Sequence, residues 1–481
     1  MINKNIDKNE EIIKNTYHNS PDITFKKLTI IKEKLLIVYN ETLTNPQLIN
    51  NFILNNLSNI EIHNIKTNNI LDFFNNTIPS HNIKYINNLN KVYDLISDGF
   101  TIIFFENKTI AFAIETKENL SRSIKEPLTE QTISGPKDAF NENYSTNIGL
   151  IRKRIKSTNL VLEETTIGKE TKTKLGILYM DNIIEKELLK EVKEKINNIN
   201  IDGILDCSNI KELITSKNSV FSLIETTERP DLTSNALLEG KICIVVDNSP
   251  FALIIPTFFS DLLMSVEDNY QNNKNVTFTR IIRYISFLLA ILTPAFYIAI
   301  TTYNHETIPV SLLVNFAAQR DGVPFPAIIE ALGMNLIFEI LRESDIRMPH
   351  LSGSAISILG AIVLGDAAVT AGIVSPIMVI VIAISAISSL MFSHVSVLNA
   401  IRLWRLIFMI FATCFGIPGI FLCGILFIIK LADLKSFGKP YLYPLAPFNL
   451  NNIKNVLFKK NIKHNKYRNK LLTNINYKRS K

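Results

Sequence analysis

Hydrophobic and polar positions divide the chain into two unlike parts and a tail. Residues 1–240 mix polar and apolar positions at the spacings of short helices and strands, residues 241–430 are mostly apolar, and residues 431–481 are basic. A helix needs about 20 apolar residues to cross a bilayer. The pattern therefore predicts a soluble α/β domain followed by an α-helical membrane domain that crosses the bilayer several times.

The longest apolar run, Gly353–Phe392, has room for two membrane helices. Gly372, Ser375 and Pro376 mark the expected hinge between them, because glycine permits a tight turn and proline cannot continue a helix. We expect the rest of the membrane domain to be organised around this helix pair.

Small residues crowd the first of these helices, and Gly360, Gly365 and Gly372 leave its backbone open to close helix packing. Asp366 lies in the same run. A carboxyl at membrane depth is costly and normally faces protein or water. Asp366 is therefore a candidate functional residue, and the alternative is a hydrogen bond to a neighbouring helix near a helix end.

Two further apolar runs, Ile281–Thr301 and Leu406–Ile429, predict one membrane span each. Ile308–Ala318 is expected to lie as an amphipathic helix at the membrane surface. If both ends of the chain lie on one side, the number of crossings must be even. Either Ala327–Leu341 does not cross fully, or Val246–Leu263 adds another membrane segment.

Ala327–Leu341 is unusual because it is short and carries Glu330, Asn335 and Glu339 among apolar residues. The spacing of the two carboxylates places them on roughly opposite sides of a helix. Glu339 and Arg342 are close enough on one helix to pair. Such a segment is expected to line an aqueous path or to sit inside an assembly, and the alternative is an interfacial helix whose carboxylates reach water.

A repeated pattern lies in the first half of the chain. GFTIIFFENKTIAFAI, which begins at Gly99, aligns without a gap with GKICIVVDNSPFALII, which begins at Gly240. In each copy an expected helix (Ile83–Ile96 or Leu232–Glu239) ends at the glycine, and two apolar strands follow around a turn with an acidic residue and Asn. We interpret the copies as two related α/β subdomains, and the alternative is chance similarity between two hairpins.

The predicted domains are a disordered polar tail (1–27), a first α/β subdomain (28–170), a second α/β subdomain (171–263), a helical transmembrane domain (278–430) and a basic tail (431–481). The chain carries 51 Lys or Arg against 44 Asp or Glu, and a basic surplus gathers in the tail. Basic residues beside a membrane span favour the cytoplasmic side. We therefore expect the tail in the cytoplasm, together with the N-terminal domain, which has no apolar signal segment before it.

No recognisable catalytic or metal-binding motif stands out. Residues 168–170 read Gly-Lys-Glu, where a phosphate-binding loop needs Ser or Thr after the Lys, and His305-Glu306 is followed by Pro309, where a zinc protease has its second His. The four cysteines form no CxxC pair and predict neither a disulfide framework nor a zinc site. We expect a protein that is not an enzyme and uses no cofactor or metal.

A basic cluster closes the expected helix Asp138–Lys156, with Arg152, Lys153 and Arg154 in its last turns. Such clusters can bind nucleic acid or anionic lipid. No aromatic residues are interleaved with this one, and no nucleic-acid-binding signature accompanies it. A solvated helix face or pairing with acidic neighbours is the preferred interpretation, and no nucleic-acid partner is expected.

Several separated blocks of the sequence have a further meaning. In chain order they read EPLTEQTISGPKDAF, LIRKRI, TTERPD, RDGVPFPAIIEAL, LRESDIRMP and LGDAAVTAGIVSPIMVIV. Together, over about residues 95–430, they resemble the A subunits of GerA-type spore germination receptors. Ser134 departs from that family, whose members often have Arg before the Gly-Pro pair, and the first 90 residues match only loosely. The blocks contain the candidate interface or loop residues Arg229, Arg320, Pro324, Arg342 and Arg347.

The resemblance implies a subunit of a nutrient sensor in the inner membrane of a bacterial spore. Its partners would be a transporter-like B subunit, where the nutrient binds, and a lipoprotein C subunit. A subunits would form a homo-oligomer in the membrane lipid and conduct ions. Rings of Asp or Glu select cations in pores, so Glu330, Glu339 or Asp366, with Asn335 beside them, are candidates to line a cation path. The alternatives are a non-conducting scaffold or signalling subunit and a secondary transporter, for which the sequence has no inverted repeat of spans.

Overall fold

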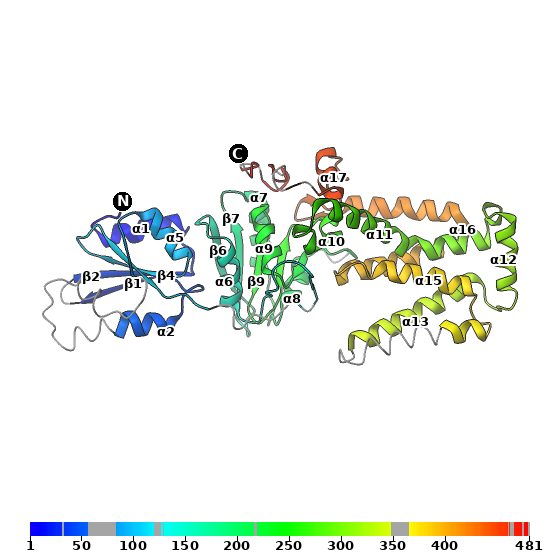
Figure 1. Ribbon diagram of the computed structural model, residues 1–481, viewed down its shortest axis with the longest axis horizontal. Helices are drawn as coiled ribbons and strands as arrows, with labels where there is room; N and C mark the ends of the chain where they lie inside the picture. Colours follow the sequence, from blue (N-terminus) through cyan, green and yellow to red (C-terminus); the bar gives the residue numbers. More distant parts are fainter. Residues whose placement is uncertain are drawn as a thin grey trace.

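Three bodies follow one another along the long axis of the molecule: an α/β unit, a second α/β unit and a helical bundle (Figure 1). The computed structural model describes residues 1–30, 33–55, 83–119, 127, 129–215, 219–347, 365–459, 461, 466–473 and 476–479. The predicted fold class, two related α/β subdomains followed by a helical domain, is confirmed.

The first unit is an antiparallel sheet with helices on both faces. Its strands, in the order β1-β2-β4-β5-β3, are β1 Ile23–Ile30, β2 Glu33–Asn40, β3 Ile83–Ile86, β4 Phe100–Phe105 and β5 Ala111–Glu115. Its helices are α1 Ile6–Thr16, α2 Pro46–Ile49, η1 Asn50–Leu54 and α5 Leu89–Ser97. α1 and α5 cover one face, and α2 with η1 covers the other (Figure 1). Alternate β4 residues point to opposite faces, so Ile102 packs toward α1 and Ile103 toward α2.

Two predictions about this unit are wrong. The first 27 residues are folded rather than disordered, because Asn5 caps α1 and Ile6 and Ile13 are buried against the sheet. The predicted helix Ile83–Ile96 is divided, since its first four residues form β3, which pairs with β5 at the sheet edge. Sparse apolar residues in a polar segment do not reveal these contacts, because the other half of each contact comes from a distant strand.

The second unit repeats the architecture of the first. Its strands, in the order β6-β7-β9-β10-β8, are β6 Leu160–Ile167, β7 Thr173–Met180, β8 Glu225–Thr227, β9 Ile242–Val246 and β10 Ala252–Ile255. Its helices are α6 Tyr144–Arg154, α7 Lys186–Asn197, α8 Cys207–Ile214 and α9 Pro230–Leu238. α6 and α9 cover one face of the sheet, and α7 and α8 cover the other.

The repeat predicted from the sequence is present in the backbone. Numbered within each unit, the two strand orders are the same. Gly99 and Gly240 have φ of 81° and 92°, and Asn107 and Asn248 both have φ of 62°. These left-handed conformations favour Gly and, to a lesser degree, Asn. The matched residues therefore hold equivalent turns.

The two units divide before α6, which corrects the predicted boundary at residue 170. β6 lies within the expected first subdomain, yet it pairs with β7 along its whole length. The predicted helix Asp138–Lys156 is also shorter, because Asn143 caps α6 and the helix ends at Arg154.

The basic cluster of α6 is paired with acidic neighbours, as preferred from the sequence. Arg152 is buried between the units and donates from Nε to Asp22 Oδ2 (2.8 Å) and from Nη2 to Asp22 Oδ1 (3.0 Å). Arg154 pairs with Asp138 at 2.5 Å, and Lys156 pairs with Asp98. The cluster therefore joins parts of the two α/β units.

The helical bundle follows a short linker. Its elements are α10 Phe259–Leu263, η2 Val266–Asn269, α11 Asn273–Thr302, η3 His305–Thr307, α12 Val310–Arg320, α13 Ala327–Arg347, α15 Pro376–Ser389 and α16 Val395–Asp433. Among the described residues, α11 and α16 are long and apolar enough to cross a bilayer. α12, which was expected over Ile308–Ala318, lies across the far end of the bundle without a buried side chain (Figure 1). α13 continues past the predicted end at Leu341.

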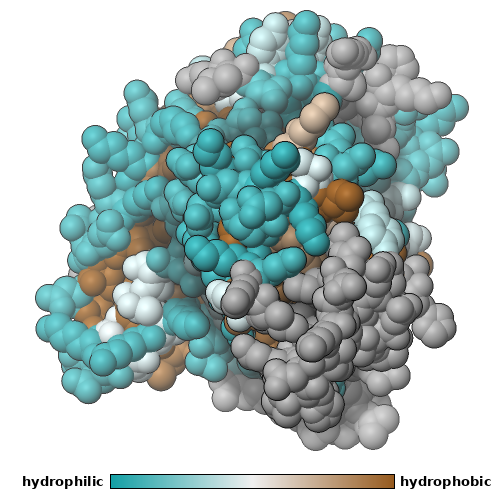
Figure 2. All heavy atoms as spheres, turned by 90° about the vertical axis from the view of Figure 1, so that its left-hand side faces the viewer, coloured by the Kyte–Doolittle hydropathy of each residue, from teal (hydrophilic) through white to brown (hydrophobic). Residues whose placement is uncertain are grey.

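The outside of the bundle is apolar. Many large apolar side chains on α11, α15 and α16 are exposed: Ile285, Leu288, Ile380, Ile387, Ile410, Phe421 and Ile428. The opposite end of the molecule, formed by the first α/β unit, has a largely hydrophilic surface (Figure 2). Apolar surfaces of this extent mark a membrane or a partner.

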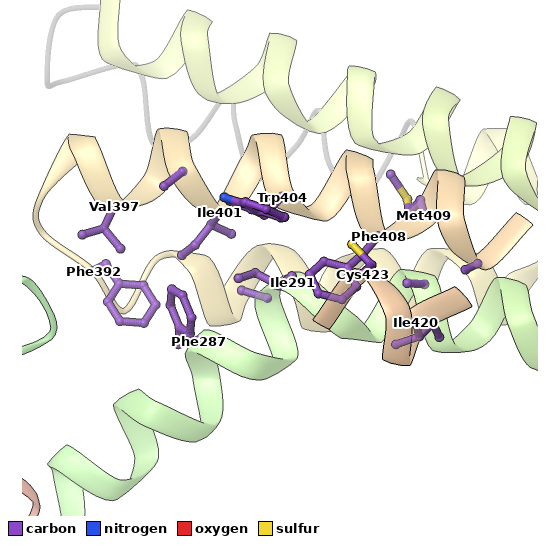
Figure 3. Packing of buried hydrophobic residues seen from close by; sticks show 14 of the residues in the cluster. Phe287, Ile291, Phe392, Val397, Ile401, Trp404, Phe408, Met409, Ile420 and Cys423 are labelled. Carbon is purple, nitrogen blue, oxygen red and sulfur yellow. The ribbon is translucent and has the colours of Figure 1, made fainter. Parts of the chain in front are cut away.

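α16 folds back on itself at Gly416, so the predicted single span Leu406–Ile429 is wrong. Gly416 has φ of 64° and ψ of −144°. The rings of Trp404 and Phe427 are 4.7 Å apart, whereas a straight helix would separate these residues by about 35 Å. In Figure 3, Trp404 and Phe408 of the first leg lie beside Cys423 and Ile420 of the second. The turn at Gly416 therefore divides the predicted span into two legs that pack against each other, and Val246–Leu263 lies in the end of β9, β10 and α10.

The segment after α16 also folds, where only a basic tail was predicted. It forms β11 (Lys435–Ser436), β12 (Lys439–Pro440) and α17 (Leu450–Leu457). Phe437, between the two short strands, is buried in the core of the second α/β unit. Ser436 Oγ donates to Leu223 O at 2.7 Å. The chain therefore returns to the second unit after leaving the bundle.

Candidate functional site

Two of the blocks singled out in the sequence meet in the second unit. Residues 129–138 form a loop that lies against the end of β8 and the start of α9, where TTERPD is found; Glu126 and Leu128 of the first block lie outside the described residues. Arg229 is fully buried between them. Its Nη1 donates to Glu130 O (3.1 Å) and Thr132 Oγ1 (3.0 Å), and its Nη2 donates to Pro136 O (2.7 Å). Asp231 accepts from Nε and Nη2 at 3.1 Å each.

The residues just before Arg229 hold the same loop. Glu228 Oε1 accepts from Thr129 N (2.6 Å), Thr129 Oγ1 (2.8 Å) and Glu130 N (2.9 Å). Thr227 Oγ1 donates to Glu130 Oε2 at 2.5 Å. Charged groups hydrogen-bonded away from water fix geometry strongly. We call residues 129–138 with Thr227–Asp231 the Arg229 clamp.

Glu130 is the titratable residue at the centre of the clamp. Burial raises the pKa of its carboxyl to about 7, the hydrogen bond from Thr227 lowers it, and the charges of Glu225 and Glu228 raise it further. Burial also raises the pKa of neighbouring Glu225 to about 7. Both carboxyls thus favour the protonated form in the folded state.

The stability of the clamp should therefore depend on pH. Because the pKa of Glu130 rises from 4.5 to about 7 on folding, its contribution is full below pH 4.5 and is lost as the pH rises through 7. We expect Glu130→Gln, which keeps an acceptor for Thr227 without a charge, to weaken this dependence. The measurement is amide exchange of residues 129–138 in the full chain from pH 5 to 8, corrected for intrinsic exchange.

A matched variant separates the two carboxyls. Glu225 remains in Glu130→Gln, so part of the pH dependence should persist and should disappear when Glu225→Gln is added. An unchanged pH dependence in the double variant would contradict this assignment.

The clamp is connected to the bundle through η2. Glu267 Oε1 accepts from Ile133 N at 2.5 Å, and Tyr270 OH donates to Asp231 Oδ2 at 2.6 Å. Asp268, between these two residues, is buried and accepts from Arg280 Nε (2.9 Å) and Arg283 Nη2 (2.7 Å) at the start of α11. A continuous set of polar contacts therefore leads from the clamp into the first long helix.

In the bundle, Glu330 joins two of the sequence blocks, RDGVPFPAIIEAL, to which it belongs, and LGDAAVTAGIVSPIMVIV. Its buried Oε2 accepts from the backbone N and the Oγ of Ser375, both at 2.9 Å, at the N-terminus of α15. Its Oε1 pairs with Arg320 Nη2 at 3.3 Å. The hinge before α15 lies where it was predicted, since Gly372 has φ of 66° and Pro376 begins the helix.

The other polar residues of α13 face α16. Asn335 donates to Ala331 O (2.8 Å) and approaches Met409 Sδ (3.8 Å). Glu339 pairs with Arg342 (2.9 Å), as its spacing predicts, and with Arg402 (3.1 Å), and lies 4.0 Å from Arg405. Glu330 and Glu339 thus meet different neighbours, as expected from opposite sides of one helix.

Asp366 differs from both glutamates. It is exposed, near the start of the helical segment 365–370, and forms no ion pair with another residue that the structure describes. Gly365 is buried, and a Cβ there would lie 3.7 Å from Val379 Cγ1 of α15, an ordinary van der Waals distance, so the contact does not require glycine. Gly360 lies outside the described residues.

The remaining candidates lie in or next to the segments that connect helices. Pro324 is exposed in the turn between α12 and α13, and Arg347 is the last residue of α13. Sequence reasoning missed Glu130 and Glu228, which lie in two of the quoted blocks, and Asp268, which lies in none of them. Among the described residues, no three His, Cys, Asp or Glu side chains gather as metal ligands do.

Comparison with known proteins identifies a matching family. Residues 11–471 match the family model described as "Bacillus/Clostridium GerA spore germination protein". Spore germination protein KA of Bacillus subtilis (strain 168) is 38% identical over 464 residues, covering 95% of this chain and 85% of that protein. Spore germination protein B1 of the same organism is 30% identical, covering 92% of each.

A solved structure also matches in part. It is the N-terminal domain of the A subunit of the Bacillus megaterium spore germinant receptor GerK3, 26% identical, with a TM-score of 0.42, covering 54% of this chain and 97% of that one. The family match extends over nearly the whole chain and confirms the resemblance seen in the sequence blocks. The chain belongs to the GerA family of spore germination proteins.

Proposed function

We propose that this chain is the A subunit of a nutrient-responsive germination receptor in the inner membrane of a spore, and that its bundle, as an oligomer, conducts cations. A transporter-like B subunit would bind the nutrient, and a lipoprotein C subunit would complete the receptor. The observation that carries the proposal is the set of carboxylates in an apolar bundle, of which Asp366 alone among the three candidates is exposed and unpaired within the described residues.

The contacts divide the candidate residues by role. Glu330 is occupied by Arg320 and Ser375, and Glu339 by Arg342 and Arg402. A buried, paired carboxylate holds helices together, because removing one partner leaves an unpaired buried charge and strongly destabilises the fold. Asp366 has no such partner among the residues that the structure describes, so its charge, repeated around an oligomer, would attract cations. We therefore assign the ion path to Asp366 and a structural role to the glutamates.

The positions of the α/β units and of the C-terminal tail support one orientation of the chain in the membrane. α11 leads away from the second α/β unit, the second leg of α16 returns toward it, and β11 and β12 pack against that unit. The α/β units and the tail would then lie on one side. Twelve Lys or Arg and no Asp or Glu follow Asp433, and such segments favour the cytoplasmic side.

A non-conducting scaffold is the second candidate function. The pairing of Glu330 and Glu339 favours it, because ion pairs inside one chain hold a fold rather than select ions. In that case the clamp and η2 would transmit a signal between the cytoplasmic part and the partner subunits without any flux through this chain.

Ion flux through the receptor, reconstituted with its B and C partners, separates the two candidates. Asp366→Asn should leave assembly intact and lower cation flux by about tenfold, because a focused field of one sign raises the local cation concentration by about 10–10³-fold. Glu330→Gln should instead weaken assembly, since Arg320 loses its charged partner. Unchanged flux through assembled Asp366→Asn receptors would favour the scaffold.

A further inference from the structure

The short helix α17 lies beside the start of α11, at the end of the bundle that faces the second α/β unit (Figure 1). Arg280 Nη1 donates to Asn455 O and Val456 O, both at 3.0 Å, so it caps the C-terminal carbonyls of α17. Lys459 N donates to Thr277 Oγ1 at 3.3 Å. These contacts fix the depth of α17 at the level of residues 277–280 of α11.

That depth is the boundary between polar and apolar sequence. The last charged residue of α11 is Arg283, less than one turn past Arg280, and the uncharged, mostly apolar stretch follows it. A segment held beside residues 277–280 would therefore lie at the headgroup level of a bilayer that surrounds the bundle. This step rests on the proposed membrane location of the bundle.

α17 and the loop before it expose apolar side chains at this level. Leu445, Phe448 and Leu450 are 50%, 70% and 60% exposed, and Phe278, in the part of α11 that contacts α17, is also exposed. Moving such a group of side chains from water to an apolar environment is favourable. A surface that covers them would therefore be stabilised by this contact.

The basic charge of the same region indicates what kind of surface covers these side chains. Lys454 of α17 is exposed, and the segment around it contains only basic charged residues after Asp433. Short amphipathic helices with apolar residues on one side and basic residues on the other bind anionic lipid surfaces. A second copy of this basic segment would be repelled by it.

We propose that α17 and residues 445–449 form an interfacial anchor that inserts Leu445, Phe448 and Leu450 into the anionic leaflet and places Lys454 among the phospholipid headgroups. Arg280, which caps α17, also binds Asp268 of η2. The anchor is thus attached to the same contacts that join the Arg229 clamp to the bundle.

The test places a single indole at the anchor in the full chain, embedded in nanodiscs of phosphatidylglycerol and phosphatidylcholine with one or the other brominated. The F448W variant is compared with L288W, on the exposed apolar face of α11, and with L205W, exposed on the second α/β unit. The signal of the natural Trp404 is subtracted with wild-type protein.

The F448W indole is expected to be quenched by both brominated lipids, and more strongly by brominated phosphatidylglycerol. Adding Lys454→Gln should lower this preference by up to about fivefold, the effect of one basic residue near an anionic surface. L205W should remain unquenched.

Four other results would overturn the inference. If F448W behaves like L205W while L288W is quenched, the bundle is in the membrane and the anchor is not. Equal quenching of F448W by the two lipids contradicts selection of anionic headgroups. A blue-shifted but unquenched F448W indicates that a protein surface, such as a second copy, covers it. If L288W is also unquenched, the proposed membrane location itself fails.

Discussion

Replacing Arg229 with Met is expected to open the Arg229 clamp and to destabilise residues 129–138 by about 3–5 kcal/mol, the usual cost of removing one partner of a buried ion pair. Asp231 would keep its charge, and Tyr270 would be its remaining side-chain hydrogen-bond donor among the described residues. Three oxygen acceptors of the loop would also lose their donor. Hydrogen exchange of the loop amides in the full chain measures the effect, with an expected increase of about a hundredfold or more.

Arg154→Met is the matched control for this variant. Arg154 also pairs with a residue of the loop, Asp138, but both side chains are about one-fifth exposed. Partly hydrated ion pairs contribute less than buried ones, so exchange should rise much less. Adding Asp231→Asn to Arg229→Met should restore part of the protection, because it removes the unpaired charge. Equal effects of the two arginine variants would show that the clamp does not depend on the buried pair.

Opening the Arg229 clamp should also destabilise η2, at the start of the bundle. Ile133 N and Asp231 are the clamp groups that contact η2, through Glu267 and Tyr270. Once the loop moves, η2 is held mainly by Asp268 and its arginines. Amide exchange in Val266–Asn269 should therefore increase in Arg229→Met and remain unchanged in Arg154→Met.

Gly416→Ala is expected to disrupt the reversal inside α16. The backbone at Gly416 lies in a region that residues with a Cβ rarely adopt, at a cost of about 1–3 kcal/mol. The added Cβ would also lie 2.7 Å from Asn304 Oδ1 and 3.0 Å from Tyr303 Cβ. Asn304 Oδ1 accepts from Ile417 N at 3.1 Å, so relieving the contact breaks the cap of the second leg. The thermal stability of the purified chain, and the protease resistance of its tail after Asp433, should both fall.

Gly424→Ala is the control within the same element. Gly424 lies inside the second leg, and no atom lies within 4 Å of a Cβ added there. Ala is favoured over Gly in a helix by about 1 kcal/mol, so stability should be unchanged or slightly higher. Similar losses in the two variants would mean that the left-handed turn at residue 416 is not what holds the reversal.

Local patterns in the sequence were sufficient to predict the repeated hairpins and the hinge before α15. At Gly99 and Gly240, and at Pro376, the residue type itself restricts the backbone, so the turn can be assigned without knowing its neighbours. The division between a mixed α/β part and an apolar helical part follows in the same way, because burial on one face or on all faces leaves different periods in the sequence.

Neither the folded N-terminus nor the reversal of α16 could be predicted locally. α1 shows only a few apolar residues, and they form a core because a sheet assembled from later strands faces them. In α16 the segment Leu406–Ile429 carries no charged residue, and Gly and Pro such as Gly416, Pro418 and Gly419 are tolerated in membrane helices, so they do not distinguish a straight helix from a hairpin. The contact of Gly416 with Asn304, which lies more than a hundred residues earlier, is what distinguishes them.

The candidate residues illustrate the same limit. The sequence by itself determined which side chains were unusual, such as Asp366 and Glu330 in apolar surroundings and Arg229 in TTERPD. The tertiary structure alone decided their partners, which are Ser375 and Arg320 for Glu330 and the loop 129–138 for Arg229. The physical reason is that the cost of burying a charge depends on the residue, which the sequence states, whereas its compensation depends on groups brought close by folding.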